Sequence, residues 1–101
     1  MIATLSPKDP AEVITVTADF STELAAGETI RVPTNTITTV PEGRDPNAAD
    51  MLIGTPEVVG GQVLQMLEGG IDGTTYLVTC VAPLSSGRIL VRRGSLLVSS
   101  Q

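Results

Sequence analysis

Few residues in this chain could take part in chemistry, and the types that enzymes use most are missing. The 101 residues include no His and a single Cys, Cys80. The commonest general acid–base group and the commonest metal ligands are therefore absent. Ser85 and Ser86 are adjacent hydroxyls, but without a nearby base neither would be activated as a nucleophile. We therefore expect no enzymatic activity, no metal site and no cofactor.

Three acidic side chains lie in the longest polar stretch, residues 41–50. These are Glu42, Asp45 and Asp50, and their spacing lacks the alternating oxygen ligands and the distal Glu of a calcium loop. We interpret them as solvated loop charges, which leaves the role of the 42–50 loop open. Asp72 stands beside glycines where it could hold a cation, but an Asx turn explains it more simply.

Arg88, Arg92 and Arg93 form the only cationic cluster in a chain whose net charge is −5. Charges on a strand edge often serve only to deter pairing with other chains. The alternative is a docking patch for an acidic neighbour, and both interpretations stay open. Cys80 lies in an apolar run, which favours a small buried hydrophobe over a reactive thiol.

The segments that must position these residues have the pattern of β-strands. The 10 Gly and 7 Pro separate short runs rich in Val, Ile, Thr and Leu, as in an all-β sandwich or small barrel. Residues 75–82 are the most apolar run, which we expect to be a central strand buried on both faces. We predict a single Ig-like β-sandwich domain over residues 1–101, with about seven or eight short antiparallel strands. The expected strands are 12–20, 28–32, 34–40, 51–54, 57–59, 62–68, 75–82 and 88–98, the last with a bulge at 92–94.

Tyr76 is the only Tyr and stands at the start of the most apolar run. In Ig-like sandwiches a Tyr near the start of the sixth strand hydrogen-bonds to the backbone a few residues upstream. Asp72 and Gly73 provide the residue types of a sharp turn just before Tyr76. We interpret Tyr76 as such a tyrosine corner, and the alternative is a Tyr that only packs in the core. Cys80 follows Tyr76 by four residues rather than two, so it does not occupy the disulfide position of antibody domains.

The first ten residues allow two interpretations. Ile2 and Leu5 belong to a short strand-forming stretch that Pro7 and Pro10 separate from the rest. Such a stretch could be an extended arm that adds to the exposed sheet edge of a neighbouring protein. It could equally be the first strand of its own sandwich, or fray. Ile2 and Leu5, with the three arginines, are the candidate interface residues.

Several motifs of this chain resemble a family of small tailed-bacteriophage virion proteins of the fiber-tail adaptor type. They cover most of the chain, while residues 34–59 match only loosely. The matching motifs are Lys8-Asp9-Pro10-Ala11-Glu12-Val13, the strand end Asp19-Phe20, the stretch 69–80, Ser86-Gly87-Arg88 and Leu96-Leu97-Val98. The resemblance implies one Ig-like domain that resides in the virion in many copies. It also implies an adaptor between tail and fiber, with portal, tail, fiber or capsid proteins as partners.

Other functions are weighed against this interpretation. A capsid decoration protein or a head-tail connector is the nearest alternative, and an Ig-like surface-binding module is a further one. An aromatic fraction of 2% counts against such a module, because aromatic side chains usually grip sugars. A pI of about 4.4 makes nucleic-acid binding improbable, and no apolar run is long enough to cross a membrane.

Overall fold

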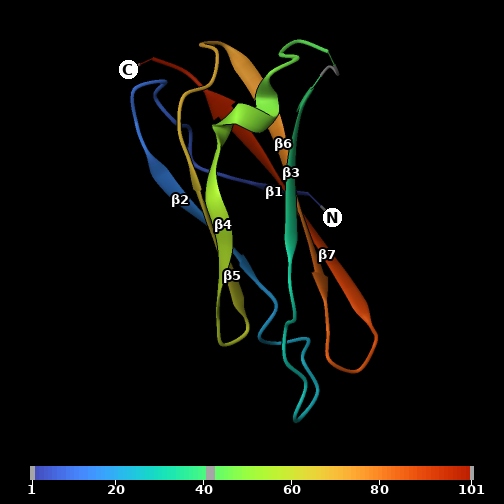
Figure 1. The fold of residues 1–101 in the computed structure, drawn as a ribbon. Helices are drawn as coiled ribbons and strands as arrows, with labels where there is room; N and C mark the ends of the chain where they lie inside the picture. Colours follow the sequence, from blue (N-terminus) through green and yellow to red (C-terminus); the bar gives the residue numbers. More distant parts are fainter. Residues whose placement is uncertain (1, 41–42, 101) are drawn as a thin grey trace.

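The computed structural model describes residues 2–40 and 43–100, and it folds them almost entirely into β-strands (Figure 1). The all-β class expected from the sequence is therefore confirmed. The strands are β1 (Ile2–Thr4), β2 (Ile14–Asp19), β3 (Thr34–Val40), β4 (Leu52–Val59), β5 (Gln62–Leu67), β6 (Thr74–Pro83) and β7 (Ile89–Val98), and a 3-10 helix, η1 (Ala48–Met51), leads into β4.

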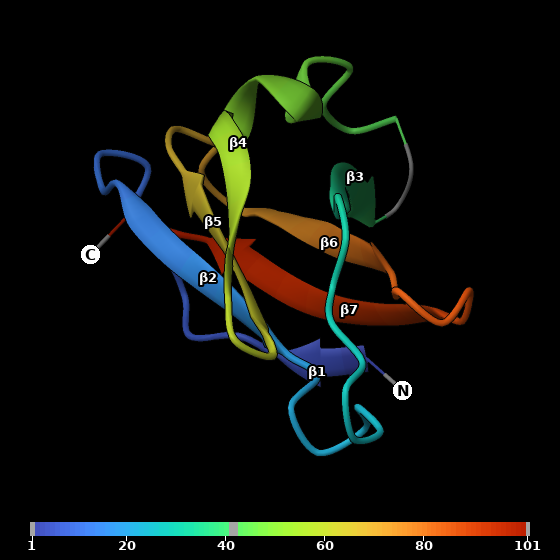
Figure 2. The same ribbon diagram turned by 60° about the horizontal axis from the view of Figure 1, so that its bottom comes forward.

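The strands form two sheets that pack face to face as a sandwich. One sheet has the order β1-β7-β6-β3 and the other β2-β5-β4. In Figure 2 the strands of the four-stranded sheet, β1, β7, β6 and β3, follow one another as neighbours. Strands β2, β5 and β4 lie on the other side. All pairs are antiparallel except β1 with β7, which is parallel. The expectation of antiparallel strands is therefore wrong at this one edge, where the chain crosses to the other sheet instead of turning back.

Alternation of side chains along each strand fills the space between the sheets. Along β6 every second residue is buried, from Thr74 through Tyr76 to Ala82, and the residues between them are partly exposed. The expectation that this strand is buried on both faces is thus wrong, because the other sheet covers only one of its faces. The buried side chains form two clusters, one that includes Tyr76 and one that includes Phe20.

The last strand runs without the bulge that the sequence suggested at 92–94. The pairing of β7 with β6 is uninterrupted from Thr74 opposite Val98 to Pro83 opposite Ile89. Gly94 has another role, because a Cβ there would stand 3.0 Å from Cδ1 of Leu5. The glycine therefore leaves the room in which Leu5 packs against β7.

Two further expectations about strands are corrected. Residues 51–54 and 57–59 belong to one strand, β4, whose pairing with β5 is irregular between Ile53 and Glu57. Residues 28–32 form only an isolated bridge, from Ile30 to Leu84. Pro33 follows them directly and has no N–H to donate to a sheet. Val32, in the same segment, is 80% exposed.

The amino-terminal segment is bound along β7 by a series of backbone hydrogen bonds, which corresponds to the interpretation of a first strand. The N–H of Leu5 donates to the carbonyl of Ser95 at 2.8 Å, and that of Lys8 donates to Leu97 at 2.9 Å. Lys8 itself is 0% exposed. Its Nζ donates to the carbonyl oxygens of Gly69 at 2.7 Å and Asp9 at 2.9 Å. One buried ammonium group thus joins the amino-terminal segment to the turn before β6.

We predict that Lys8→Met lowers the stability of the fold strongly. The substitution keeps an unbranched apolar side chain but removes the ammonium group with both of its hydrogen bonds, and it leaves the Gly69 carbonyl without its partner. Hydrogen bonds to a charged group contribute about 1.5–3 kcal/mol, so the loss should lower the Tm by roughly 10 °C in thermal unfolding. Arg31→Met is the matched control, because Arg31 is exposed and its loss should change stability by less than about 0.5 kcal/mol. Equal melting curves for the two variants would contradict this role of Lys8.

Candidate functional site

The Tyr76 hydroxyl connects three parts of the chain. It accepts a hydrogen bond from the N–H of Ile71 at 2.8 Å and donates one to Oδ2 of Asp45 at 2.7 Å. The turn before β6 is closed by the N–H of Thr74, which donates to the carbonyl of Ile71 at 3.1 Å. Gly73 has a φ of +81° in this turn, a conformation that side chains with a Cβ rarely adopt. This geometry matches that of a tyrosine corner.

Asp45 is not the solvated loop charge that the sequence suggested. Its Oδ2 receives the Tyr76 hydroxyl, and its Oδ1 accepts a hydrogen bond from the N–H of Asn47 at 2.9 Å. Burial raises the pKa of Tyr76, the Ile71 N–H lowers it, and the Asp45 carboxylate raises it further. Asp50 is exposed on η1, and Glu42 lies outside the described residues. The sequence offered no signal for the Tyr76–Asp45 contact, because the two residues are 31 positions apart.

Asp72 contacts Ser100, beyond the end of β7, instead of forming the Asx turn expected from the sequence. Its Oδ1 accepts a hydrogen bond from the N–H of Ser100, and its Oδ2 accepts one from the Ser100 hydroxyl, both at 2.9 Å. The N–H of the neighbouring Gly73 donates to the carbonyl of Val98 at 2.7 Å. The turn that carries Asp72 and Gly73 therefore positions Tyr76 on one side and the end of β7 on the other.

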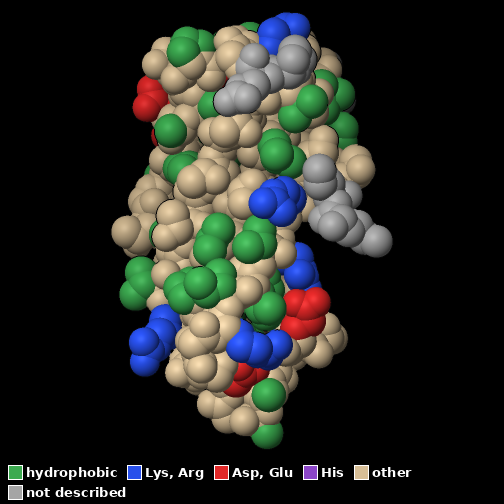
Figure 3. Space-filling view, turned by 90° about the vertical axis from the view of Figure 1, so that its right-hand side faces the viewer, with side chains coloured by type: hydrophobic (Ala, Val, Ile, Leu, Met, Phe, Trp, Pro, Cys, Tyr) green, Lys and Arg blue, Asp and Glu red, His purple; other side chains and the backbone are tan. Residues whose placement is uncertain are grey.

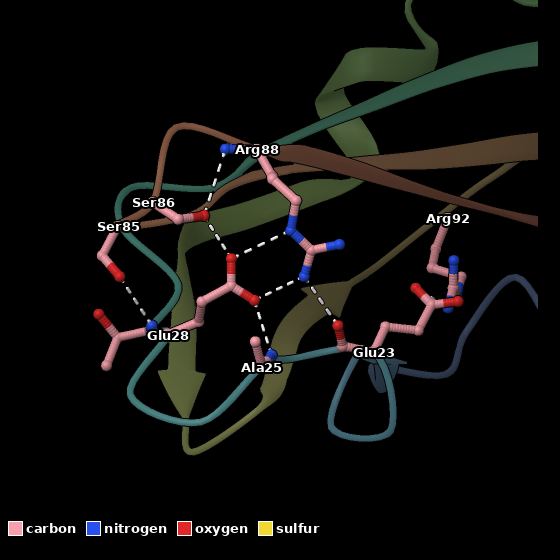
Figure 4. Close-up of polar contacts among 8 residues, drawn as sticks. Glu23, Ala25, Glu28, Ser85, Ser86, Arg88 and Arg92 are labelled. Atoms are coloured by element: carbon pink, nitrogen blue, oxygen red, sulfur yellow. Dashed lines mark hydrogen bonds and ion pairs between the residues drawn. The ribbon is translucent and has the colours of Figure 1, made fainter.

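Arg88 is paired within the chain. Its Nε and Nη2 donate to the carboxylate of Glu28 at 3.0 and 2.5 Å, and Nη2 also donates to the carbonyl of Glu23 at 2.9 Å. The Ser86 hydroxyl donates to the same Glu28 carboxylate, as does the N–H of Ala25 at 2.7 Å. Figure 4 shows how these contacts tie the connection between β2 and β3 to the β6–β7 hairpin.

The other two arginines of the expected cluster point to opposite faces of β7. Arg92 forms an ion pair with Glu23 at 2.5 Å, and its guanidinium lies 5.1 Å from the centre of the Phe20 ring. Arg93 is exposed and forms no ion pair within residues 2–40 and 43–100. The three arginines thus do not make one cationic patch, and Arg93 alone is left for an external partner.

Arg93 lies on the outer face of the four-stranded sheet, which we call the β7 face. The outward residues of β3, β6 and β7 are otherwise uncharged, and several are apolar. Ile89 is 64% exposed and Val40 53%. The apolar residues of this face are Val40, Leu77, Val81, Pro83, Ile89, Val91 and Leu97. Figure 3 looks onto this side of the molecule, where hydrophobic side chains gather below the middle.

The remaining candidate residues contribute no reactive group. Cys80 is buried, and burial raises the pKa of its thiol to about 11, so the thiol stays protonated near neutral pH. Ile2 pairs with Arg93 by its backbone, and its side chain lies outside the described part. Within the described ranges, no three His, Cys, Asp or Glu side chains come together as a metal site requires. The same residues contain no helix that is long and apolar enough to span a membrane.

We predict that Tyr76→Phe destabilises the protein while the volume of its core stays nearly the same. The change leaves the Ile71 N–H and the Asp45 carboxylate without their shared partner, which costs on the order of 1–3 kcal/mol. Thermal unfolding should show a decrease of roughly 4–8 °C per kcal/mol. Asp45→Asn, which keeps an acceptor for the hydroxyl, should lose less than Tyr76→Phe. A Tyr76→Phe melting curve identical to that of the wild type would refute the corner.

Because the pKa of Glu28 is lowered in the folded chain, we predict that the protein loses stability in acid. Hydrogen bonds from Arg88, Ser86 and Ala25 lower its pKa from 4.5 to about 2. A carboxyl group whose pKa is lower in the folded chain stabilises the fold above the unfolded value and loses that effect as pH falls through the folded value. Stability should therefore decrease between about pH 4.5 and pH 2. Urea unfolding of Glu28→Gln and of Arg88→Met should show a smaller decrease over that interval, and profiles parallel to the wild type would contradict this assignment.

Comparison with known proteins supports a single family. The family model of the podophage GP4 fiber-tail adaptor protein gp77 matches residues 8–97. Neither a curated protein nor a solved structure gives a match. The matched residues include Lys8, the Tyr76 corner and nearly all of β7. The chain therefore belongs to the family of the podophage fiber-tail adaptor protein gp77.

Proposed function

We propose that this protein is a non-enzymatic component of the phage virion that joins the tail to its fibers. The observation that carries the proposal is the family match over residues 8–97. An adaptor needs surfaces for neighbouring proteins rather than a reactive site, and the buried, protonated Cys80 agrees with that role. The protein would be made in the bacterial cytoplasm and incorporated in several copies during assembly.

We assign the sandwich to the Ig-like type from its connectivity. Taken in chain order, β3, β6 and β7 correspond to strands C, F and G, and β2, β4 and β5 correspond to B, D and E. The first strand differs, because β1 pairs with β7 instead of β2. The Tyr76 corner at the start of the sixth strand supports the same assignment. In such domains binding residues lie on a rigid scaffold, which suits an adaptor.

The β7 face supports docking to a neighbouring virion protein. Arg93 is its one charged group among the outward residues of β3, β6 and β7, and it is surrounded by aliphatic and threonine side chains. A complementary partner would present an apolar surface with one carboxylate that meets Arg93. Such a charge pair fixes register and orientation, while the surrounding apolar area supplies affinity.

A carbohydrate-binding module is less well supported. The only two aromatic residues of the chain, Phe20 and Tyr76, are both 0% exposed. They therefore offer no surface on which a sugar ring could stack. The description of the family as an adaptor likewise favours this role over capsid decoration.

We predict that Arg93→Glu reduces incorporation into phage particles by roughly tenfold or more, because a like charge would then face the partner's carboxylate. The measurement is the amount of this protein per purified particle when the variant is the only copy. Arg44→Glu is the control, since it makes the same charge reversal at an exposed residue outside the sheets. The melting temperatures of both variants should match the wild type. Full incorporation of Arg93→Glu would exclude the β7 face as the docking surface.

A further inference from the structure

A cavity of about 190 Å³ penetrates the sandwich between its two sheets. It begins between the edge strands β1 and β2, and we call it the edge slot. Its walls are mostly small or aliphatic, and Asp19 and Arg92 are the charged residues on its inner side, because Arg93 points its side chain to the opposite face of β7. The residues that line it are Ala3, Leu5, Val16, Thr17, Ala18, Asp19, Asn35, Val63, Gln65, Val78, Cys80, Arg92, Arg93 and Gly94.

The edge slot lies where the two core clusters fail to meet. Val78 belongs to the cluster of Tyr76, and Cys80 belongs to the cluster of Phe20. At this level of the interior the chain places Asn35, Gln65 and Gly94 instead of large apolar side chains. The small and polar side chains at this level leave a cleft that opens to solvent between the sheets.

The far wall of the edge slot carries an acceptor without a donor. Nδ2 of Asn35 donates to Oε1 of Gln65 at 2.9 Å, and Nε2 of Gln65 donates to the carbonyls of Ile53 and Met66. Oδ1 of Asn35 is buried and has no hydrogen-bond partner in the described part of the chain. A buried acceptor of this kind is costly unless something donates to it.

The strand edge beside the slot is only partly covered. β1 pairs with Arg93, Gly94 and Ser95, whereas β7 begins four residues earlier, at Ile89. Among the described strands, none pairs with residues 89–92 on that side of β7. An added strand could therefore pair with this part of β7, next to the slot, where the Val91 carbonyl now accepts a hydrogen bond from Nη1 of Arg92 at 3.3 Å.

We infer that the edge slot receives one aromatic side chain with a hydrogen-bond donor, Trp or Tyr, from an extended segment of a neighbouring virion protein. The segment would continue the line of β1 along residues 89–92 of β7, as in strand addition, and its donor would reach Oδ1 of Asn35. The volume agrees, because an apolar cavity of about 150 Å³ holds a benzene ring. The inference rests on the proposed adaptor function and adds a second contact, separate from the β7 face.

Small molecules test the slot without knowledge of the partner. Indole and indene have nearly the same shape, but only indole has an N–H. In NMR titrations of the wild-type protein, indole should shift the side-chain amide signals of Asn35 and Gln65. It should bind about tenfold more tightly than indene, which corresponds to one hydrogen bond. Absence of any shift at these amides, or equal affinities for indole and indene, would overturn the inference.

Filling the slot from inside tests its role in assembly. Ala18→Met places a flexible apolar side chain in the slot, so it should raise the Tm of the isolated protein by roughly 4–8 °C. It should also abolish indole binding and reduce incorporation into particles at least about tenfold. Ala26→Met is the control, because Ala26 is exposed in a turn and its replacement should leave the Tm, indole binding and incorporation unchanged.

The outcomes separate the slot from the adaptor function. Loss of Ala18→Met from particles that retain Ala26→Met would support the slot as a docking site. Full incorporation of Ala18→Met, with indole binding abolished, would overturn the slot while leaving the adaptor function in place. Absence of the wild-type protein from purified particles would instead reject the adaptor function, and the slot proposal with it.

Discussion

The hydroxyl of Tyr76 makes the contacts that hold together the end of the sandwich where β6 begins. At this one atom a strand of the large sheet, the turn before that strand and the connection from β3 to η1 meet. The hydroxyl fixes the positions of these three backbone segments relative to one another. A sandwich with so few aromatic residues has few large side chains that could fix them by packing. The buried ammonium group of Lys8 extends the same junction to the amino-terminal segment through the carbonyl of Gly69. Polar contacts thus provide order that larger cores obtain from aromatic packing.

Of the three arginines near the sequence of β7, two are paired within the chain and one, Arg93, is exposed. Arg88 and Arg92 both contact the connection between β2 and β3, where Glu23 and Glu28 neutralise them. These ion pairs hold a long connection that has almost no strand structure of its own. What remains on the β7 face is a single cation among threonines and aliphatic side chains. A surface of this kind discriminates between partners through one charge, and it avoids the cost of desolvating several.

Sequence patterns predicted the features that depend on neighbours along the chain. The strand positions of β2 and β6, the turn residues Asp72 and Gly73 before Tyr76 and the loop before η1 all follow from local residue types. The patterns did not reveal contacts made across the fold, such as Asp45 with Tyr76 or Glu28 with Arg88, whose members are 31 and 60 positions apart. Gly94 was misread for the same reason. A glycine inside a strand often marks a bulge, but here it makes room for Leu5, a residue from the far end of the sequence.

If a partner docks in the edge slot as proposed, its binding is coupled to the stability of this protein. The edge slot of about 190 Å³ leaves apolar side chains of the free chain facing solvent, and burying them would contribute favourable free energy. A partner that fills the gap and completes the edge of β7 returns that free energy as binding, because whatever binds only the folded state stabilises it. The free protein is then the less stable form and the assembled protein the more stable one. Under this proposal, folding and incorporation would be coupled through the same side chains, because Asn35 and Gly94, which line the slot in place of large apolar residues, would make room for the partner.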